Sequence, residues 1–320
     1  MLSRVADSLY WMSRYLERAE HTARLIAVGL NMMLDQAPHT TSLRWERLLA
    51  SLRAYPPPSG SGDAYAIASM LTFDTSNEGS IFFCIAAARE NARQVREQIS
   101  SEMWEQVNRL YLNMRRSSID AIWQGEPLEF YHDVKQGVHL FQGITDATMT
   151  HGEGWQFIQV GRYLERASLT AALIDQHFRP YLEAPIDAPL ALDYIDWVGL
   201  LKCCTAFEAY CKVYTADVQP ESVAEFLLLN AEGPRSVRFA ADRIQRSMQA
   251  IAQATGTRSA GRAERLAGRL RAAMDYGQVD EIIAESMHSY LDGIQRQCGA
   301  IHGAIYQAYI SYPVDTALTS

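Results

Sequence analysis

One charged hexapeptide occurs twice in this chain of 320 residues. The segment from Arg14 to Ala19 reads Arg-Tyr-Leu-Glu-Arg-Ala, and the segment from Arg162 to Ala167 is identical. The flanking sequence also matches, with ten identities in the sixteen positions from Trp11 to Ile26 at a constant offset of 148. Guanidinium groups grip carboxylate or phosphate in a bidentate way, so each copy could bind an anion. The candidate ligand-binding residues are Arg14, Glu17, Arg18, Arg162, Glu165 and Arg166.

Each copy lies on a long apolar seam. Apolar side chains recur at alternating three- and four-residue steps from Leu2 to Met33, and again from Phe157 to Phe178. This period predicts a long helix in each place, and we expect Pro180 to end the second. The Arg-Glu-Arg trio falls on the face opposite the seam, where its neighbours are also apolar. A helix that is apolar on both sides is buried between layers, so we expect the trios in a partly dry interior or cleft.

Two arrangements of these charges are open. In the first, Arg14 and Glu17 pair at i,i+3 within their helix, so that Arg18 and Arg166 need another carboxylate or a bound anion. In the second, the two helices pair with each other, arginine of one with glutamate of the other. The second arrangement needs no ligand and would serve only to pack the helices.

Further arginines provide secondary candidates for anion binding. One group shares a helix face at i, i+4 and i+7, although such a stripe is more often a solvated surface. The other follows Gly233-Pro234 at a predicted helix start, where the helix dipole attracts anions. These secondary candidates are Arg89, Asn91, Arg93 and Arg96 in the first group, and Arg235 and Arg238 in the second.

Other kinds of chemistry find little support. A di-iron bundle needs two Glu-x-x-His motifs, and Glu285 and His288 have that spacing. Glu17 and His21 are four residues apart and do not supply the second motif. We therefore predict no bound metal. The chain has no nucleophile elbow, no phosphate loop and no dinucleotide-binding glycine motif. Cys203, Cys204 and Cys211 lie in an apolar helical run and are interpreted as inert buried thiols.

Composition sets further limits. The formal net charge of −8 argues against general nucleic-acid binding, and no run of about 18 apolar residues suggests a membrane span. The five cysteines are odd in number and include no Cys-x-x-Cys, which is typical of reduced thiols. We therefore expect a cytoplasmic protein that binds neither nucleic acid nor membrane.

The pattern as a whole predicts an all-α fold. Further helical periodicity covers 85–99, 102–124, 129–149, 190–214, 235–254, 261–275 and 279–310, with Gly- and Pro-rich breakers between. A fainter match aligns residues 73–81 with 229–237 without gaps. We therefore expect an internal duplication, a multi-helix bundle built from two related halves, 1–150 and 151–320, packed as one unit.

The sequence resembles a bacterial family, the alpha-E domain, named for its Glu-Arg motif. Leu2 to Glu20 looks like the start of this family, and the likeness continues through Ala88 to Arg93 and Pro234 to Phe239. It covers essentially the whole chain. The second copy has Ser168 and Leu169 where the first has Glu20 and His21, so nothing is carried over for those positions.

This resemblance implies a set of partners. Members of the family are encoded beside, or fused to, circularly permuted ATP-grasp proteins and transglutaminase-like proteins. That association suggests formation or cleavage of an amide bond on a peptide or a small amino-acid metabolite. The chain itself would bind no cofactor, since ATP and Mg would be bound by the partner ligase.

Three functions are compatible with these observations. The first is an accessory subunit of an ATP-grasp amide ligase, in which the arginines of both trios hold carboxylate or phosphate oxygens of the acceptor. The second is a free-standing enzyme with Glu17 or Glu165 as general base, although arginine neighbours make a carboxylate a poor base. The third is a structural scaffold whose charged trios only fix the helix register.

Overall fold

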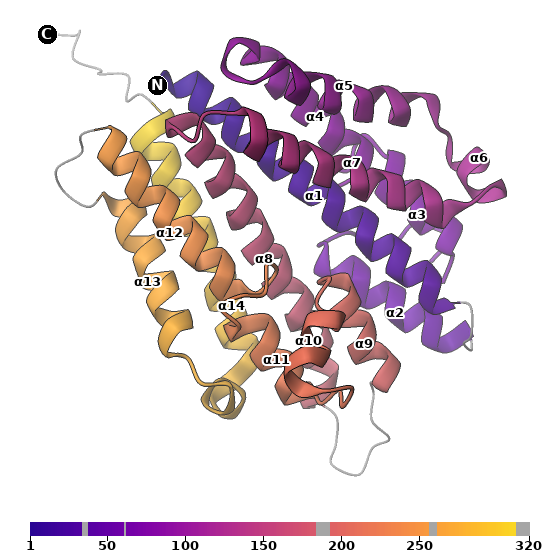
Figure 1. Cartoon of the computed structure of the whole chain (residues 1–320). Helices are drawn as coiled ribbons and strands as arrows, with labels where there is room; N and C mark the ends of the chain where they lie inside the picture. Colours follow the sequence, from indigo (N-terminus) through magenta and orange to yellow (C-terminus); the bar gives the residue numbers. More distant parts are fainter. Residues whose placement is uncertain (34–37, 61, 184–192, 256–260, 312–320) are drawn as a thin grey trace, which may run out of the picture.

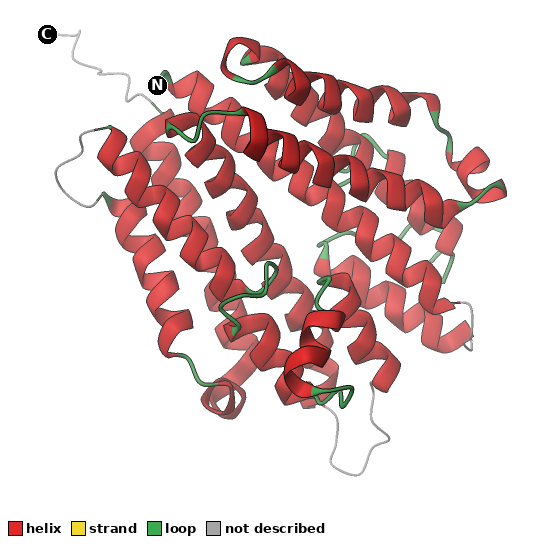
Figure 2. Cartoon of the chain, viewed as in Figure 1, coloured by secondary structure: helices red, strands yellow, loops and turns green. Residues whose placement is uncertain are grey.

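The computed structural model describes residues 1–33, 38–60, 62–183, 193–255 and 261–311. All regular structure within these ranges is helical, and Figure 2 shows helices joined by short loops. The predicted all-α class is therefore confirmed. Within the same ranges, no helix combines the length and the apolarity needed to cross a membrane.

Several helices begin at an oxygen-bearing side chain that caps the first turn, such as Ser100, which accepts from the amide of Met103. The helices are α1 (Ser3–Met33), α2 (Pro38–Ser51), α3 (Ala64–Phe73), α4 (Ile81–Gln94), α5 (Ser101–Arg116), α6 (Ile119–Gln124), α7 (Pro127–Thr148), α8 (Glu153–Glu183), α9 (Tyr194–Cys203), α10 (Phe207–Tyr214), α11 (Pro220–Leu229), α12 (Val237–Ala254), α13 (Arg262–Tyr276) and α14 (Val279–Ile305), with short turns η1 (Arg96–Gln98) and η2 (Tyr306–Ile310).

The two longest helices form the centre of the bundle. Helices α1 and α8 lie side by side and run in the same direction (Figure 1), and the terminal ammonium of Met1 contacts Glu153 Oε2 at 3.0 Å. Helices α4 and α7 pack against α1, whereas α12 and α14 pack against α8. Because α1 and α8 are covered on several sides, polar groups on their facing surfaces must find partners inside the protein.

Small side chains allow α1 and α8 to approach closely. A Cβ atom on Gly161 would lie 2.3 Å from Ser13 Oγ and 2.4 Å from the carbonyl oxygen of Tyr10. The sequence offset of 148 places Ser13 and Gly161 at the same position of the two copies. The crossing point therefore brings the two copies of the motif face to face.

The helix boundaries differ from the sequence prediction in four places. The predicted helical stretch 85–99 ends at Gln94 of α4, and the separate turn η1 follows it. Pro180 does not end α8, which continues to Glu183, because only the last turn follows the proline and loses little hydrogen bonding. The predicted helix 102–124 is broken between α5 and α6, where Ser118 caps a new helix by accepting from the amide of Ala121. The predicted helix 190–214 is two helices, α9 and α10, and its residues 190–192 lie outside the described ranges.

We predict that Gly161→Ala lowers the free energy of unfolding by about 1–3 kcal/mol, the usual cost of inserting a methyl group into a packed core. The added Cβ would meet backbone as well as side-chain atoms, so α1 and α8 would have to move apart. Urea denaturation measures the effect.

Gly143→Ala in α7 is the matched control, because a Cβ there would meet no atom within 4 Å. Because alanine favours the helix more than glycine does, this substitution should raise the free energy of unfolding by up to about 1 kcal/mol. Equal effects of the two substitutions would contradict the close approach.

Candidate functional site

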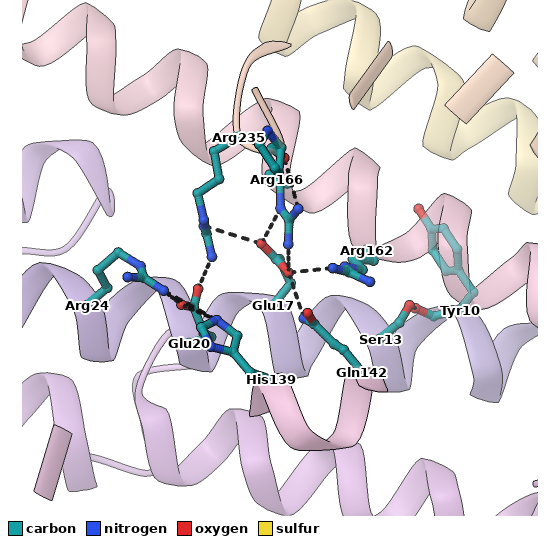
Figure 3. A network of polar contacts seen from close by, with 11 residues as sticks. Tyr10, Ser13, Glu17, Glu20, Arg24, His139, Gln142, Arg162, Arg166 and Arg235 are labelled. Atoms are coloured by element: carbon teal, nitrogen blue, oxygen red, sulfur yellow. Dashed lines mark hydrogen bonds and ion pairs between the residues drawn. The ribbon is translucent and has the colours of Figure 1, made fainter. Parts of the chain in front are cut away.

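Glu17 lies at the centre of a network of guanidinium groups between α1 and α8. Its side chain is completely buried. Arg166 from α8 donates from Nε to Oε1 at 2.7 Å and from Nη2 to Oε2 at 2.8 Å, and Figure 3 shows this bidentate pair. Arg235 Nη1 approaches Oε1 at 3.4 Å, and Gln142 donates to Oε2 at 3.3 Å. Arg162 Nε is more distant, 3.9 Å from Oε2.

Glu165 has the reciprocal arrangement. Arg14 Nε donates to its Oε2 at 2.7 Å, and Arg18 Nε donates to its Oε1 at 2.7 Å. The Glu165 side chain is 5% exposed, whereas those of Arg14 and Arg18 are 14% and 21% exposed. Both arginines come from α1, so each carboxylate of the hexapeptides is held by arginines of the other helix.

Of the two arrangements left open by the sequence, the structure has the cross-pairing of the two helices, and the intrahelical pair between Arg14 and Glu17 is not formed. Among the described residues, Arg14 forms its ion pair with Glu165, and Glu17 forms its shortest pair with Arg166. The close crossing of α1 and α8 allows each carboxylate to take up linear hydrogen bonds across the interface. Those bonds also fix how far one helix can slide along the other.

The arginines keep both carboxylates ionised. Burial alone would raise the pKa of Glu17, but Arg166 and Arg235 outweigh this effect and hold its pKa well below the ordinary value. Burial acts in the same direction on Glu165, and Arg14 and Arg18 again lower its pKa. A carboxylate with a depressed pKa and occupied oxygens is a poor proton acceptor near neutral pH.

A second buried carboxylate, Glu20, extends the network around Glu17 (Figure 3). It is completely buried and pairs with Arg24 in its own helix and with Arg235, whose guanidinium thereby bridges Glu17 and Glu20. His139 Nε2 lies 3.2 Å from Glu20 Oε1, and burial together with the Arg24 charge lowers the pKa of His139 to about 4. This side of the α1–α8 interface is filled by the protein's own charged groups.

The side around Glu165 is open. A cleft of about 370 Å³ exposes parts of Arg14, Arg18 and Glu165. The rest of its wall comes from the end of α2 and the turn after it, from the loop before α4, and from α8 and α14. These residues include Arg53, Glu78, Gly79, Ser168, Ala172 and Gln295. Arg53 donates from Nη2 to Gln295 Oε1 at 2.8 Å. The volume lies in the range of about 300–1,000 Å³ that is usual for small-molecule sites.

Arg18 contributes a guanidinium to this cleft that is only partly engaged by the protein. Its Nε is used by Glu165, and its Nη1 donates to the carbonyl of Glu78 at 3.4 Å. Its Nη2 donates no hydrogen bond within the described residues. The neighbouring Glu165 raises the pKa of Arg18 despite burial, so the guanidinium stays charged.

The first secondary group, Arg89, Asn91, Arg93 and Arg96, does not converge on the cleft. Arg89 donates to Asn108 at 2.7 Å on α5, and Arg96 lies over the ring of Trp104 at 4.8 Å. Arg93 is 60% exposed and pairs with Glu90, as expected for the solvated alternative. The side chain of Asn91 turns back along its own helix, and its Nδ2 donates to the carbonyl of Ala87 at 2.9 Å.

The second secondary group is divided. Arg235 is buried and joins the Glu17–Glu20 network. Arg238, one turn further along, pairs instead with Asp275 of α13 at 3.1 Å and with the carbonyl of Leu229 at 3.2 Å. The two residues between them turn the second side chain away from the network.

The described residues contain no group of three or more His, Cys, Asp or Glu side chains placed to hold a metal. Glu285-x-x-His288 of α14 has a counterpart with the same spacing in Glu129-x-x-His132 of α7. All four side chains are exposed on the outside of α14 and α7. His288 Nδ1 contacts Asp175 at 2.7 Å, which accounts for its orientation.

Sequence reasoning missed several members of the site. Glu20 and Arg24 could have been found from their i,i+4 spacing on the buried face of α1. His139, Gln142 and Arg53 carry no such signal, because only tertiary packing brings them to the hexapeptides.

Comparison with known families gives one match over nearly the full length. The Alpha-E model, described as a predicted alpha-helical domain with a conserved ER motif, matches residues 1–310. The Glu-Arg step of that description is present here as Glu17-Arg18 and Glu165-Arg166. No solved structure matches the chain.

Proteins that contain a similar region occur in mycobacteria. A protein of Mycobacterium bovis and one of Mycobacterium tuberculosis, both named as uncharacterized, are each 23% identical to this chain over 326 residues. The alignment covers 94% of this chain and 35% of each relative. This chain therefore spans about a third of the length of the curated relatives it matches.

We predict that Glu17→Ala lowers the free energy of unfolding by about 3–5 kcal/mol, as is usual when one partner of a buried ion pair is removed. The substitution leaves the guanidinium groups of Arg166 and Arg235 without their shared carboxylate. Chemical denaturation measures the loss. Asp292→Ala is the control, since Asp292 and Arg296 are exposed and such pairs contribute about 0–1 kcal/mol.

A second prediction concerns His21, which is buried with its Nε2 unpartnered. Burial and then the Arg235 charge lower its pKa from 6.5 to about 3. Below pH 6.5 the unfolded chain binds a proton that the folded protein excludes, so stability falls as the pH decreases. His21→Leu, which copies Leu169 of the second helix, should flatten this fall by about 1.4 kcal/mol per pH unit. Denaturation of both proteins between pH 6.5 and 5 checks this, and parallel curves would contradict it.

Proposed function

Because this chain belongs to the Alpha-E family, we propose that it is a helical accessory subunit of an ATP-grasp amide ligase. In this function it binds or orients an anionic acceptor, a small amino acid or a peptide. The observation that carries the proposal is the cleft in which Arg14 and Arg18 are partly exposed beside Glu165. ATP and Mg would be bound by the ligase and not by this chain.

The relatives support an accessory role. In the mycobacterial proteins, the matched region makes up about a third of a longer chain, so there the helical unit is covalently joined to further sequence. The resemblance stated above supplies the identity of the expected partners, a circularly permuted ATP-grasp protein and a transglutaminase-like protein. A separate chain with the same helical unit would then bind such a partner non-covalently.

The electrostatics favour positioning over catalysis by this chain. A free-standing enzyme would need Glu17 or Glu165 as a base, and both have depressed pKa values and arginine partners on their oxygens. The scaffold function fits the Glu17 side, where every charge is paired internally, but gives no reason for the open cleft. Fixed guanidinium groups can instead hold an acceptor in the orientation that the ligase requires.

We also infer that the chain is an internal duplication, with related halves 1–150 and 151–320. Corresponding hydrogen bonds support this inference. The Arg18 guanidinium donates to the carbonyl of Glu78, and that of Arg166 to the carbonyl of Pro234. The two arginines are 148 positions apart in the sequence, and the two residues that accept from them, in the loops, are 156 positions apart.

The loops themselves show the same correspondence. Ser80 caps α4 by accepting from the amide of Phe83, and Ser236 caps α12 by accepting from the amide of Phe239. The offset of 156 continues through α7 and α14, which then share the identical pairs Glu129/Glu285, His132/His288, Gly137/Gly293 and Gly143/Gly299. The packing also corresponds in the two halves, since α4 and α7 pack against α1 in the way that α12 and α14 pack against α8.

Affinity purification tests the proposed partnership. We expect the tagged chain to recover an ATP-grasp protein from the cells that naturally produce it. Arg18→Lys should keep this complex but lose ATP-dependent amide formation, followed as ADP release with a panel of amino acids. Lysine retains the charge but cannot hold Glu165 and an acceptor with one planar fork.

Arg296→Gln is the control, because Arg296 is 72% exposed on α14 and, among the described residues, pairs only with Asp292. It should leave complex and activity unchanged. Recovery of the wild-type chain as a lone species under gentle conditions would contradict the accessory role.

A further inference from the structure

The two sides of the α1–α8 interface differ in what fills them. Around Glu17 the space is occupied by four charged or ionisable side chains, Glu20, Arg24, His139 and Arg235. With the two offsets given above, their counterparts around Glu165 are Ser168, Ala172, Gln295 and Gly79. All four counterparts line the open cleft.

The open cleft is therefore the space that the charged side chains fill in the other half. Glycine replaces the Arg235 guanidinium, and serine replaces the Glu20 carboxylate. On the filled side these two groups form an ion pair, and the guanidinium also reaches Glu17 Oε1 at 3.4 Å. The filled side thus shows that one cation and one carboxylate, paired with each other, fit beside the carboxylate of the hexapeptide.

We propose that the cleft binds an acidic α-amino acid, whose ammonium and α-carboxylate take the places that Arg235 and Glu20 occupy on the filled side. The inference deepens the proposed function and rests on it for the role of the cleft. The Arg162–Arg166 half, by contrast, is structural and binds no ligand.

The cleft offers a partner to each charge of such a ligand. The ammonium lies against Glu165, as the Arg235 guanidinium lies against Glu17, with the exposed carboxylate of Glu78 on the same wall. The α-carboxylate lies near Gln295, the counterpart of His139, and near Arg53, which donates to the Gln295 amide oxygen. The Gln295 amide nitrogen makes no hydrogen bond to another described residue and can donate to the ligand.

The net charge of the cleft selects an acidic side chain. Its charged lining residues are the cations Arg14, Arg18 and Arg53 and the carboxylates Glu78 and Glu165, which leaves a net charge of +1. A ligand with one ammonium and two carboxylates balances this charge. Arg18 Nη2, which has no partner within the described residues, is the donor for the second carboxylate.

Calorimetry on the isolated full chain tests the ligand class with four probes. We expect L-glutamate to bind at least tenfold more tightly than glutarate, which lacks the ammonium, or inorganic phosphate. Putrescine, which lacks carboxylates, should not bind measurably. Equal or tighter binding of glutarate or phosphate would overturn the zwitterion and leave a simple anion site, and the absence of binding by every probe would overturn the site itself.

The double variant Gly79→Arg, Ser168→Glu tests the location, because it places the ion pair of the filled side in the cleft. We expect at least a hundredfold loss of L-glutamate binding with the melting temperature within a few degrees of wild type. Arg53→Gln, at an exposed position, should weaken binding at least tenfold without affecting folding, and it keeps the test decisive if the double variant misfolds. Arg296→Gln should bind normally, and unchanged binding by the double variant or by Arg53→Gln would overturn the inference.

The same variants separate this inference from the proposed function. Loss of L-glutamate binding while the ATP-grasp protein still copurifies assigns the cleft to the ligand and not to the partner interface. If the wild-type chain recovers the partner but binds no L-glutamate, the inference fails and the accessory role stands.

Discussion

Two carboxylates buried between parallel helices determine the architecture around them. Glu17 and Glu165 are almost inaccessible to water, and an isolated carboxylate in such a place would cost several kcal/mol. Each is compensated by arginines of the opposite helix, so the charges can be satisfied only when α1 and α8 lie in one register. The small residues Ser13 and Gly161 permit the close approach that these hydrogen bonds require. Packing and charge pairing therefore specify the same crossing.

An identical hexapeptide produces two different environments because its neighbours differ. Around Glu17, the residues Glu20 and Arg235 close the interface with further buried charges. Around Glu165, serine and glycine at the corresponding positions leave a cleft that reaches the surface. The chemistry of the site is thus set less by the motif than by the side chains one turn away and on the facing loops.

Much of the fold followed from the sequence, because apolar periodicity reports directly on helix faces. The extent of α1 and α8 and the burial of their charged trios could be expected from apolar residues on both faces. The partners of those charges could not, since Arg14 and Glu17 have a spacing suitable for an intrahelical pair whether or not another helix lies nearby. Arg53 reaches the cleft from the turn after α2 and Gln295 from α14, so their role depends on tertiary packing that no local pattern encodes.

The open half remains stable without a ligand because its buried charge is already compensated. Arg14 and Arg18 satisfy both oxygens of Glu165, so an acceptor is not needed to complete the fold. The binding energy then comes from contacts added to this completed pairing, in a cleft where water competes for hydrogen bonds. Such a site favours modest affinity and rapid exchange, which suits a subunit that presents an acceptor to an enzyme and releases it with every turnover. A site that needed its ligand to neutralise Glu165 would instead hold that ligand as part of the structure.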